Sequence, residues 1–410
     1  MSTAYGRGKY GAGPYSGRTP PILPALYPIQ LWVWSRTGTL KAMYQLGSSP
    51  LVSLQFLHND TGCADCTIEF ASPVDIVKSD LIKIRLGIDQ WYYTGVIRRV
   101  PIAGVTTQGY TYTGLGYNDY FNRIMTGNDS FATKTISYIL NYVITTYIIT
   151  NTPINYNVGK LNPPAITVTS LSMPFVYIKD VFDTMLNLAN STGIEYLYGV
   201  DKDGDFYFQP RSSNVMSTLF TANTGRYGIP AYEPQDTIEE LTALIVLRND
   251  KTYYGTINSV LNNDIYMDKV NAPTMSDADL LNWATGILMD RQRTLRSASI
   301  EWPITFPDEL NPIVADGYLR IMSTIPPAQQ QTATYTTCGD GNCGDGICGG
   351  SDAQPYTTSD DTLAIKQVEY DISTSGATRK IELGTIPLLL EDAILKVQKK
   401  LQTVQISLGM

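Results

Sequence analysis

The sequence Leu51-Val-Ser-Leu-Gln-Phe-Leu57, Asn59-Asp-Thr-Gly62, Cys66-Thr-Ile-Glu-Phe70 decides the fold, within a stretch from Tyr44 to Tyr120. Similar segments follow it, namely Leu81-Ile-Lys-Ile-Arg-Leu86, Trp91-Tyr-Tyr-Thr-Gly-Val-Ile97 and Gly109-Tyr-Thr-Tyr-Thr-Gly-Leu-Gly-Tyr117. Apolar and polar residues alternate in these short runs, and Gly, Pro, Asn and Asp separate them. The pattern predicts an antiparallel sheet that closes into a barrel.

The composition favours a protein of an assembly over a free cytosolic enzyme. The 410 residues are enough for two or three domains with a core each. Charged residues make up only 17% of the chain, whereas there are 28 Tyr, a residue that suits strand-rich domains and protein contacts. The net charge of −8 argues against a protein that binds nucleic acid tightly, because such binding needs a basic stripe that releases counterions from the phosphates. DNA could pass by such a surface without sticking.

Targeting and membrane segments are not expected. The most apolar stretch, Ile136 to Ile149, is too short and too polar to span a bilayer. The N-terminus is rich in Gly and Tyr and lacks the apolar region of a signal peptide. We therefore expect a protein without a membrane span that is made and assembled in a cytoplasm.

The first two parts of the chain are an arm and a barrel. Residues 1–24 are expected to form a flexible arm, because a segment so rich in Gly, Tyr and Pro cannot hold a core alone. Two interpretations remain open, a disordered tail and a strap over a neighbouring subunit, and the interleaved tyrosines favour the strap. Residues 25–125 form the first β-barrel.

Residues 126–215 are predicted to form a small α+β domain. Apolar residues recur at helical spacing from Ile136 to Tyr147 and from Ile178 to Ala189, and Gly193 follows the second run. The turn Asp201-Lys-Asp-Gly204 then predicts a hairpin between Ile194–Val200 and Phe206–Phe208.

Residues 216–387 are predicted to form a second barrel with an inserted helix and a Cys-rich loop at 336–352. Ser276-Asp-Ala-Asp279 resembles a capping box and opens the inserted helix. The predicted strands are Leu241–Arg248, Ala298–Trp302, Gly317–Met322, Leu363–Ile372 and Arg379–Leu383. Residues 388–410 end the chain with a helix and a tail.

Several segments, and their order over residues 30 to 390, carry a resemblance to a known family. They are Cys66-Thr-Ile-Glu-Phe70, Asp80-Leu-Ile-Lys-Ile-Arg85, Tyr93-Thr-Gly-Val-Ile97, Val200-Asp-Lys-Asp-Gly-Asp-Phe-Tyr-Phe208, Asp316-Gly-Tyr-Leu-Arg-Ile321 and Arg379-Lys-Ile-Glu-Leu-Gly384. In this respect the chain resembles the baseplate-hub or tail-tip hub proteins of tailed bacteriophages.

The resemblance implies a mainly β fold with α+β insertions, in which two tail-tube-like antiparallel β-barrels flank a small α+β domain. It implies a structural homotrimer that places its barrels in a ring, continues the tail tube and carries the central spike or tip. The expected partners are the tail tube protein, the spike or tip protein, the tape-measure protein and other baseplate subunits. Phage DNA would cross the lumen during ejection without specific binding. The protein would belong to the virion tail, assembled in the host cytoplasm, and would not be an enzyme.

Cysteine is the unusual feature of the sequence. Cys338, Cys343 and Cys348 repeat at equal spacing in a Gly-rich loop, and Cys63 and Cys66 lie in the first barrel. The three loop thiolates could hold an iron–sulfur cluster or a zinc ion, with Cys63 or Cys66 as fourth ligand. Some tail-tip hub proteins hold an iron–sulfur cluster through clustered cysteines, so the resemblance favours this site. Disulfides and free thiols are the alternatives, and the odd count favours a ligand set or a bond across the trimer.

Other candidate sites have structural explanations. His58, the single histidine, lies near Cys63 but lacks an orienting partner for a Cys-His nucleophile. Asp201-Lys-Asp-Gly-Asp205 lacks the residue order of an EF-hand, so a type I′ or G1-bulge hairpin explains it better. The pairs Glu239-Glu240, Asp308-Glu309 and Asp360-Asp361 would serve a peptidoglycan hydrolase, the first alternative function. A receptor-binding tail-tip protein is the second.

Overall fold

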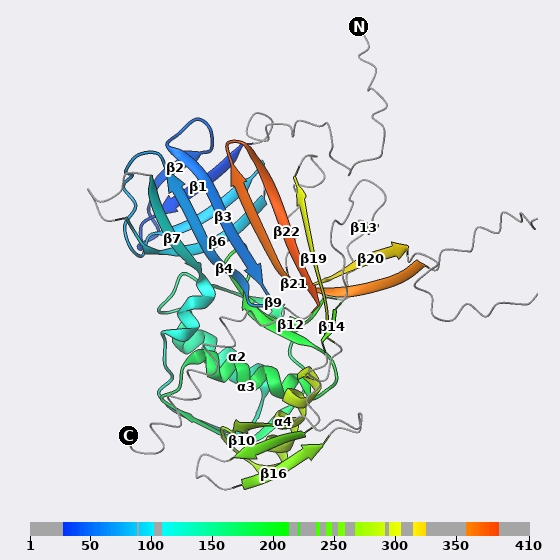
Figure 1. The fold of residues 1–410 in the computed structure, drawn as a ribbon. Helices are drawn as coiled ribbons and strands as arrows, with labels where there is room; N and C mark the ends of the chain where they lie inside the picture. Colours follow the sequence, from blue (N-terminus) through cyan, green and yellow to red (C-terminus); the bar gives the residue numbers. More distant parts are fainter. Residues whose placement is uncertain are drawn as a thin grey trace, which may run out of the picture.

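The computed structural model describes residues 28–87, 90–101, 109–212, 220–221, 235–237, 243–247, 253–258, 267–291, 295–304, 315–324 and 358–384. The predicted arm at 1–24, the Cys-rich loop at 336–352 and the helix after residue 388 lie outside these residues. The mainly β fold with α+β insertions is confirmed: strands fill the upper part of Figure 1, and the helices lie in the lower part together with further strands such as β10 and β16.

Seven strands make up the N-terminal β segment. They are β1 (Ile29–Trp34), β2 (Leu40–Gln45), β3 (Leu51–Asn59), β4 (Gly62–Phe70), β5 (Leu81–Leu86), β6 (Gln90–Arg99) and β7 (Tyr110–Gly116). The period-two pattern explains their burial. In β5, for example, Ile82, Ile84 and Leu86 are buried, whereas the residues between them are partly exposed. The five strands predicted from the decisive stretch are confirmed, and β1 and β2 precede them.

The C-terminal β segment contains β19 (Leu295–Pro303), β20 (Tyr318–Thr324), β21 (Thr358–Ser373) and β22 (Gly376–Gly384), together with the short strands β13 (Phe220–Thr221) and β14 (Gln235–Thr237). The first half of β21 pairs with β20. Its second half lies between β22 and β3. A single long strand therefore links the C-terminal strands to the N-terminal segment.

The β segments that correspond to the two predicted barrels form one sheet in the described part of the chain. Its order is β14-β19-β22-β21-β3-β4-β7-β6-β5-β1-β2, and β2 pairs there only with β1. Apolar residues of both segments also form one cluster, from Ile29 to Leu383. The ladder from Ser53↔Ser373 to Asn59↔Gln367 joins the two segments.

The predicted α+β domain follows the N-terminal segment. The 3₁₀ helix η1 (Tyr117–Asn122) leads into it. The domain contains β8 (Asn128–Thr135), α2 (Ile136–Val143), the π-helical turn η2 (Ile144–Ile148), β9 (Asn155–Leu161), β10 (Thr167–Pro174), α3 (Ile178–Asn190), β11 (Tyr196–Val200) and β12 (Asp205–Pro210). Both predicted helices and the β11–β12 hairpin are confirmed. In the described residues, no helix combines the length and the apolarity that crossing a membrane requires.

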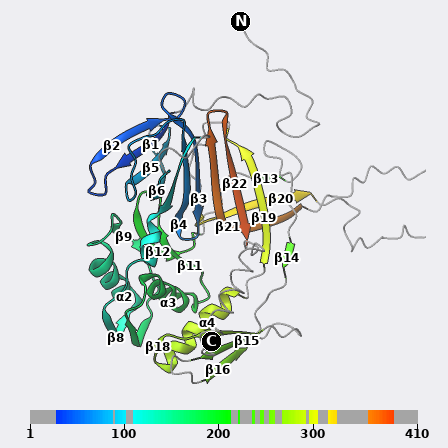
Figure 2. The same ribbon diagram turned by 60° about the vertical axis from the view of Figure 1, so that its left-hand side comes forward.

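The inserted helix predicted from Ser276 is confirmed as α4 (Asp277–Arg291). It packs on the α+β domain beside α3 rather than on the C-terminal strands (Figure 2). Asp279 holds it there by accepting hydrogen bonds from the backbone N–H groups of Thr169 and Ser170 at 2.8 and 3.1 Å. The neighbouring strands are β15 (Ala243–Leu247), β16 (Tyr253–Asn258), β17 (Met267–Asn271) and β18 (Thr274–Met275).

The contact between α3 and α4 predicts the effect of Gly286→Ala. Alanine in a helix is intrinsically favoured over glycine by about 1 kcal/mol. Here, however, a Cβ at Gly286 would lie 1.8 Å from the carbonyl oxygen of Asn187. We expect thermal denaturation to show destabilisation of about 1–3 kcal/mol, whereas the exposed α4 control Asn282→Ala should be neutral or stabilising. A stabilised Gly286→Ala protein would contradict this packing.

Candidate functional site

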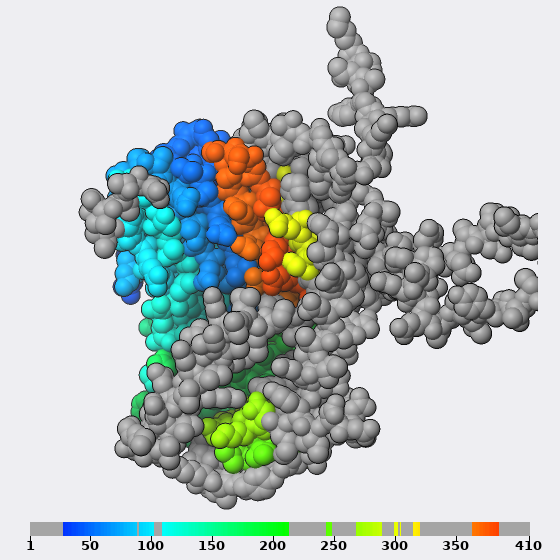
Figure 3. Space-filling view, in the orientation of Figure 1, coloured from blue at the N-terminus to red at the C-terminus, as the bar shows by residue number. Residues whose placement is uncertain are grey.

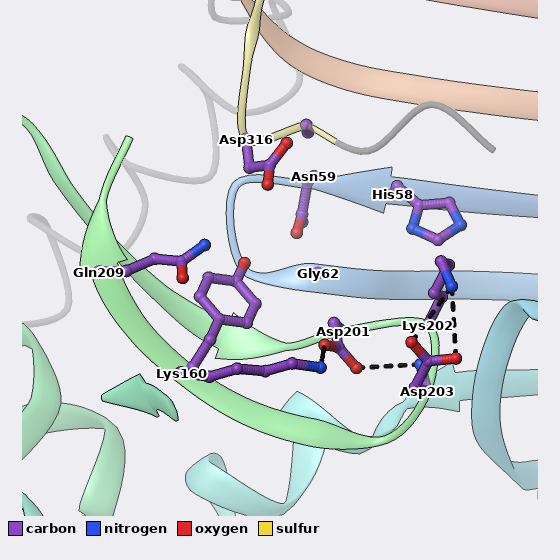
Figure 4. A pocket seen from close by; sticks show the side chains of 11 residues that line it. His58, Asn59, Gly62, Lys160, Asp201, Lys202, Asp203, Gln209 and Asp316 are labelled. Carbon is purple, nitrogen blue, oxygen red and sulfur yellow. Dashed lines mark hydrogen bonds and ion pairs between the residues drawn. The ribbon is translucent and has the colours of Figure 1, made fainter. Parts of the chain in front are cut away.

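A cavity of about 210 Å³ lies where the N-terminal strands, the α+β domain and the C-terminal segment meet (Figure 4). Its lining comes from β3 and β4, from β9, from the β11–β12 hairpin and from the segment before β20. The lining residues are His58, Asn59, Gly62, Lys160, Asp201, Lys202, Asp203, Tyr207, Gln209, Ala315 and Asp316. The sequence predicted the hairpin but not this junction.

Close backbone approach holds the hairpin against the β3–β4 turn. The N–H of Val200 donates to the carbonyl oxygen of Thr61 at 3.1 Å. Gly62 has φ +96°, and a Cβ there would lie 1.9 Å from the carbonyl oxygen of Val200. The turn therefore requires glycine at this position both for its backbone conformation and for space.

The Asp201–Asp205 turn is a hairpin turn, as predicted. Gly204 has φ +92°, and its N–H donates to the carbonyl oxygen of Asp201 at 3.0 Å, which fits the G1-bulge form. The Lys160 ammonium lies 2.5 Å from Asp201 Oδ2 and 2.8 Å from Asp205 Oδ2. A lysine therefore neutralises the carboxylates that a calcium ion would need, and the calcium interpretation gains no support.

Arg211 lies at the centre of an ion-pair network beside the cavity. Its side chain donates to the carbonyl oxygens of Ala315 and Ile365, both at 3.1 Å. It also donates to Asp60 Oδ1 and Glu195 Oε1, both at 3.0 Å. Burial opposes the charge of Arg211, but the carboxylates of Asp60 and Glu195 outweigh this effect and raise its pKa. One guanidinium thus contacts all three parts of the fold.

Lys366 of β21 completes this network. Its ammonium donates to Asp60 Oδ2 at 3.2 Å and to Glu195 Oε1 at 3.0 Å. Two cations and two carboxylates from four separate stretches of sequence therefore balance one another at the junction. No local sequence pattern marks this network, because its charges lie as far as 306 residues apart.

His58 lies in the core of the β sheet. It is 2% exposed and packs against the rings of Phe56, Tyr93 and Tyr370. Its Nδ1 is 3.9 Å from Cys63 Sγ. Burial lowers the pKa of His58 to about 4, and the charge of Lys202 acts in the same direction. The structural interpretation of this histidine therefore holds, because a neutral imidazole sits among aromatic rings.

Cys63 and Cys66 are both buried free thiols. They are three positions apart, yet a register shift in the β3–β4 ladder lets both face the core. Burial raises the pKa of Cys63 to about 12 and raises that of Cys66 as well. The assignment of Cys63 or Cys66 as a fourth metal ligand stays a prediction. Cys338, Cys343 and Cys348 lie outside the described residues, so the iron–sulfur, zinc and disulfide assignments of the loop stay predictions.

The suggested carboxylate pairs do not assemble into a described site. Glu239-Glu240 and Asp308-Glu309 lie outside the described residues. Asp360 and Asp361 lie on β21, where they pair with Met322 and Ile321 of β20. This position is in a strand ladder and not in the cavity.

The solvent side of the shared sheet carries a band of carboxylates, which we call the acidic face. The strands that form it lie side by side at the front of Figure 3, coloured blue for β3 and β4, orange for β21 and β22, and yellow for β19. Its carboxylates are Asp65, Glu69, Glu301, Glu369, Asp371 and Glu382. Lys380 is the cation among them and donates to Glu382 at 2.9 Å. On β3, between β4 and β21, the outward side chains include the neutral residues Ser53 and Gln55.

The acidic residues of this face lie close enough to interact. Gln55 of β3 donates to Glu369 of β21 at 2.6 Å, and Ser53 donates to Glu69 at 2.8 Å. Desolvation raises the pKa of Asp371, and the charges of Glu369, Glu69 and Glu301 raise it further. The period-two spacing of Glu369 and Asp371 could have indicated one acidic strand, but not the neighbours that extend the face.

The Arg211 network predicts a large loss of stability on Arg211→Met. The change leaves Asp60 and Glu195 with only Lys366 as cation in a desolvated junction, and breaking such a pair costs about 3–5 kcal/mol. The exposed pair Lys179–Asp183 provides the control, because Lys179→Met should cost less than about 0.5 kcal/mol. Guanidinium chloride denaturation measures both. Equal, small losses would show that the network does not hold the junction.

The low pKa of His58 predicts a pH-dependent stability. The unfolded chain takes up this proton near pH 6.5 and the folded chain only near pH 4. The contribution of neutral His58 to the free energy of unfolding is therefore complete above pH 6.5. It falls by about 3 kcal/mol as the pH drops to 4. We expect His58→Phe to remove this share of the pH dependence in urea titrations between pH 7 and pH 4. Parallel curves for both proteins would contradict the assignment.

Comparisons with known proteins agree with this fold. No protein-family model and no curated protein sequence matches the chain. Three solved structures are similar over most of their length. The 43 kDa tail protein of prophage MuSo2 from Shewanella oneidensis has a TM-score of 0.57 at 8% identity, over 87% of this chain and 98% of that chain. The tail protein from Neisseria meningitidis MC58 has a TM-score of 0.57 at 9% identity, over 90% of this chain and 99% of that chain.

The third structure is the prophage tail protein gp18 from Listeria monocytogenes EGD-e. It has a TM-score of 0.51 at 10% identity, over 91% of this chain and 99% of that chain. Identities this low establish the fold alone. The chain has the fold of phage tail proteins, as the resemblance of its sequence implied.

Proposed function

We propose that the chain is a structural subunit of a phage tail, a homotrimeric hub that joins the tail tube to the central spike or tip. The ring of three copies encloses a channel through which DNA is ejected. Its further partners are the tape-measure protein and other baseplate subunits, and its place is the virion tail, assembled in the host cytoplasm. The fold shared with tail proteins supports the tail assignment.

The acidic face is the observation on which the proposed channel rests. A wall along which DNA slides must repel phosphates along its whole length, because isolated cations would bind them by counterion release. The acidic face offers carboxylates on β4, β21, β22 and β19, separated by neutral residues such as Gln55 and Thr67. At physiological ionic strength charges act over about 8 Å, so adjacent strands give an almost continuous negative surface.

The shared sheet explains how both β segments can form one surface of the proposed channel. Because β3 and β21 are hydrogen-bonded neighbours, the acidic face has no seam between the N-terminal and C-terminal segments. Each copy then presents both β segments to the channel as one surface. In a ring of three, both segments of each copy would contribute to the match with a sixfold tube.

The cavity does not favour the alternative of a peptidoglycan hydrolase. Such an enzyme needs one protonated and one ionised carboxyl group that both reach the substrate. Asp201 is paired with Lys160 and Asp203 with Lys202. In these contacts the carboxylates of the hairpin stabilise the turn. The structural role therefore remains the better supported function.

Charge reversal on the acidic face tests this proposal. We expect particles that carry Glu69→Lys with Asp371→Lys to assemble but to eject DNA about tenfold more slowly or worse, because cations in the channel bind phosphates. Asp75→Lys with Asp180→Lys changes the same number of exposed carboxylates elsewhere and should leave ejection unchanged. Ejection rates are measured by dye fluorescence after receptor triggering. Equal rates for both variants, or a monomeric wild-type protein by native mass spectrometry, would refute the proposal.

A further inference from the structure

The cavity at the junction contains two polar side chains that no other described residue satisfies (Figure 4). The ring of His58 is 2% exposed, and its Nε2 atom is buried without a hydrogen-bond partner among the described residues. Apart from its own backbone N–H group, the carboxylate of Asp316 has no hydrogen-bond or ion-pair partner in the same part of the chain. Buried polar groups in folded proteins are nearly always paired with protein, water or a ligand. The cavity therefore has the properties of a binding site.

The other charged side chains of the cavity wall pair with one another. These contacts are Lys160–Asp201, Lys160–Asp205 and Lys202–Asp203. Arg211 beside the cavity is matched by its own two carboxylates. Among the described lining residues, Asp316 is thus the carboxylate that lacks a cation in contact. Burial raises the pKa of Asp316, because desolvation outweighs the charge of Arg211. A cation in the cavity would offset the cost of burying this carboxylate.

His58 restricts the kind of cation. Its ring is neutral, because burial lowers its pKa to about 4, and a neutral imidazole presents the lone pair of Nε2 when its proton is on Nδ1. Nδ1 lies 3.9 Å from Cys63 Sγ, a weak acceptor that fits this tautomer. A cation that carries N–H donors can therefore neutralise Asp316 and donate to His58, directly or through one water molecule.

The size of the cavity favours an organic cation over a bare metal ion. Its volume is about 210 Å³, whereas a single water molecule needs only about 10–15 Å³. In the described part of the chain, no group of three His, Cys, Asp or Glu side chains could hold a metal ion. The wall also includes Tyr207 and Ala315, whose ring and methyl group suit the methylene groups of an alkyl chain.

We propose that this cavity binds one aliphatic primary ammonium group, with Asp316 as its counter-ion and His58 Nε2 as the acceptor of one of its N–H groups. A free alkylamine and the lysine side chain of another protein chain both offer this chemistry. The inference rests on the cavity alone and does not depend on the proposed channel.

His58 itself reports binding, because it is the single histidine of the chain. Protein labelled with ¹⁵N in histidine is titrated with n-butylamine at constant pH and ionic strength. We expect a saturable change of the Nε2 resonance over the millimolar range. Tetramethylammonium has the charge without N–H donors, and butanol has the alkyl chain without the charge, so neither should reproduce the change. An Nε2 resonance that n-butylamine leaves unchanged, or that tetramethylammonium shifts equally, would overturn the proposal.

The second experiment tests the counter-ion. Asp316→Asn keeps the shape of the side chain but removes its charge, so it should weaken n-butylamine binding in the same titration about tenfold or more. Asp75→Asn is the matched control, because the Asp75 side chain is 88% exposed outside the cavity, and it should bind like the wild type. Equal affinities of the two variants would contradict the role of Asp316.

Thermal denaturation without amine separates binding from folding. Asp316→Asn should unfold at the same temperature as the wild type or higher, since the carboxylate that it removes is unpaired. A lower unfolding temperature would show that Asp316 stabilises the fold through a protein partner, and would contradict its assignment as the counter-ion of a ligand.

A third titration identifies the source of the ammonium group. Nα-acetyl-lysine N-methylamide presents this group on a lysine side chain with peptide groups on both sides. If it binds at least as tightly as n-butylamine, a lysine of another protein chain is the favoured ligand. Binding of n-butylamine and putrescine alone would favour a free amine. If none of the three compounds binds, the cavity is not an ammonium site.

Discussion

The buried guanidinium of Arg211 is the constraint on which the junction of the fold depends. A charge removed from water must be neutralised and hydrogen-bonded. Here that requirement brings Asp60, Glu195 and Lys366 together with two backbone carbonyl groups. The β3–β4 turn, the α+β domain and β21 therefore converge at one point. The cavity, the hairpin contact at Gly62 and the start of the β3–β21 ladder all lie around this point.

The position of β21 in turn determines the chemistry of both sides of the sheet. Because side chains alternate along a strand, a shift of one residue between β3 and β21 would turn Glu369 and Asp371 into the core and Val368 and Tyr370 into solvent. The ion pair between Lys366 and Asp60 at the end of the ladder supports the observed register. A network that is itself remote from the acidic face thus helps to keep that face acidic.

The two outer surfaces of the sheet have different properties, and this difference suits an assembly. Around β3, β21 and β22 most exposed side chains are carboxylates, hydroxyls and amides, with Val52 and Lys380 among them, and the carboxylates repel phosphate. Around β1 and β2 they are Trp, Leu and Met flanked by cations, which favour desolvation by another protein.

Local features of the sequence determined most individual elements. Alternation predicted the strands from Leu51 to Tyr117, apolar spacing predicted α2 and α3, and turn chemistry predicted the hairpin at Gly204, because each pattern depends on neighbours within a few residues. Only the tertiary structure decided that β3 pairs with β21, that α4 packs on α3, that Arg211 meets Lys366, and that a register shift turns both Cys63 and Cys66 into the core. These outcomes depend on contacts between residues far apart in the sequence, 314 positions for Gln55 and Glu369. No local period encodes such contacts, because burial and charge balance act only after the chain has folded.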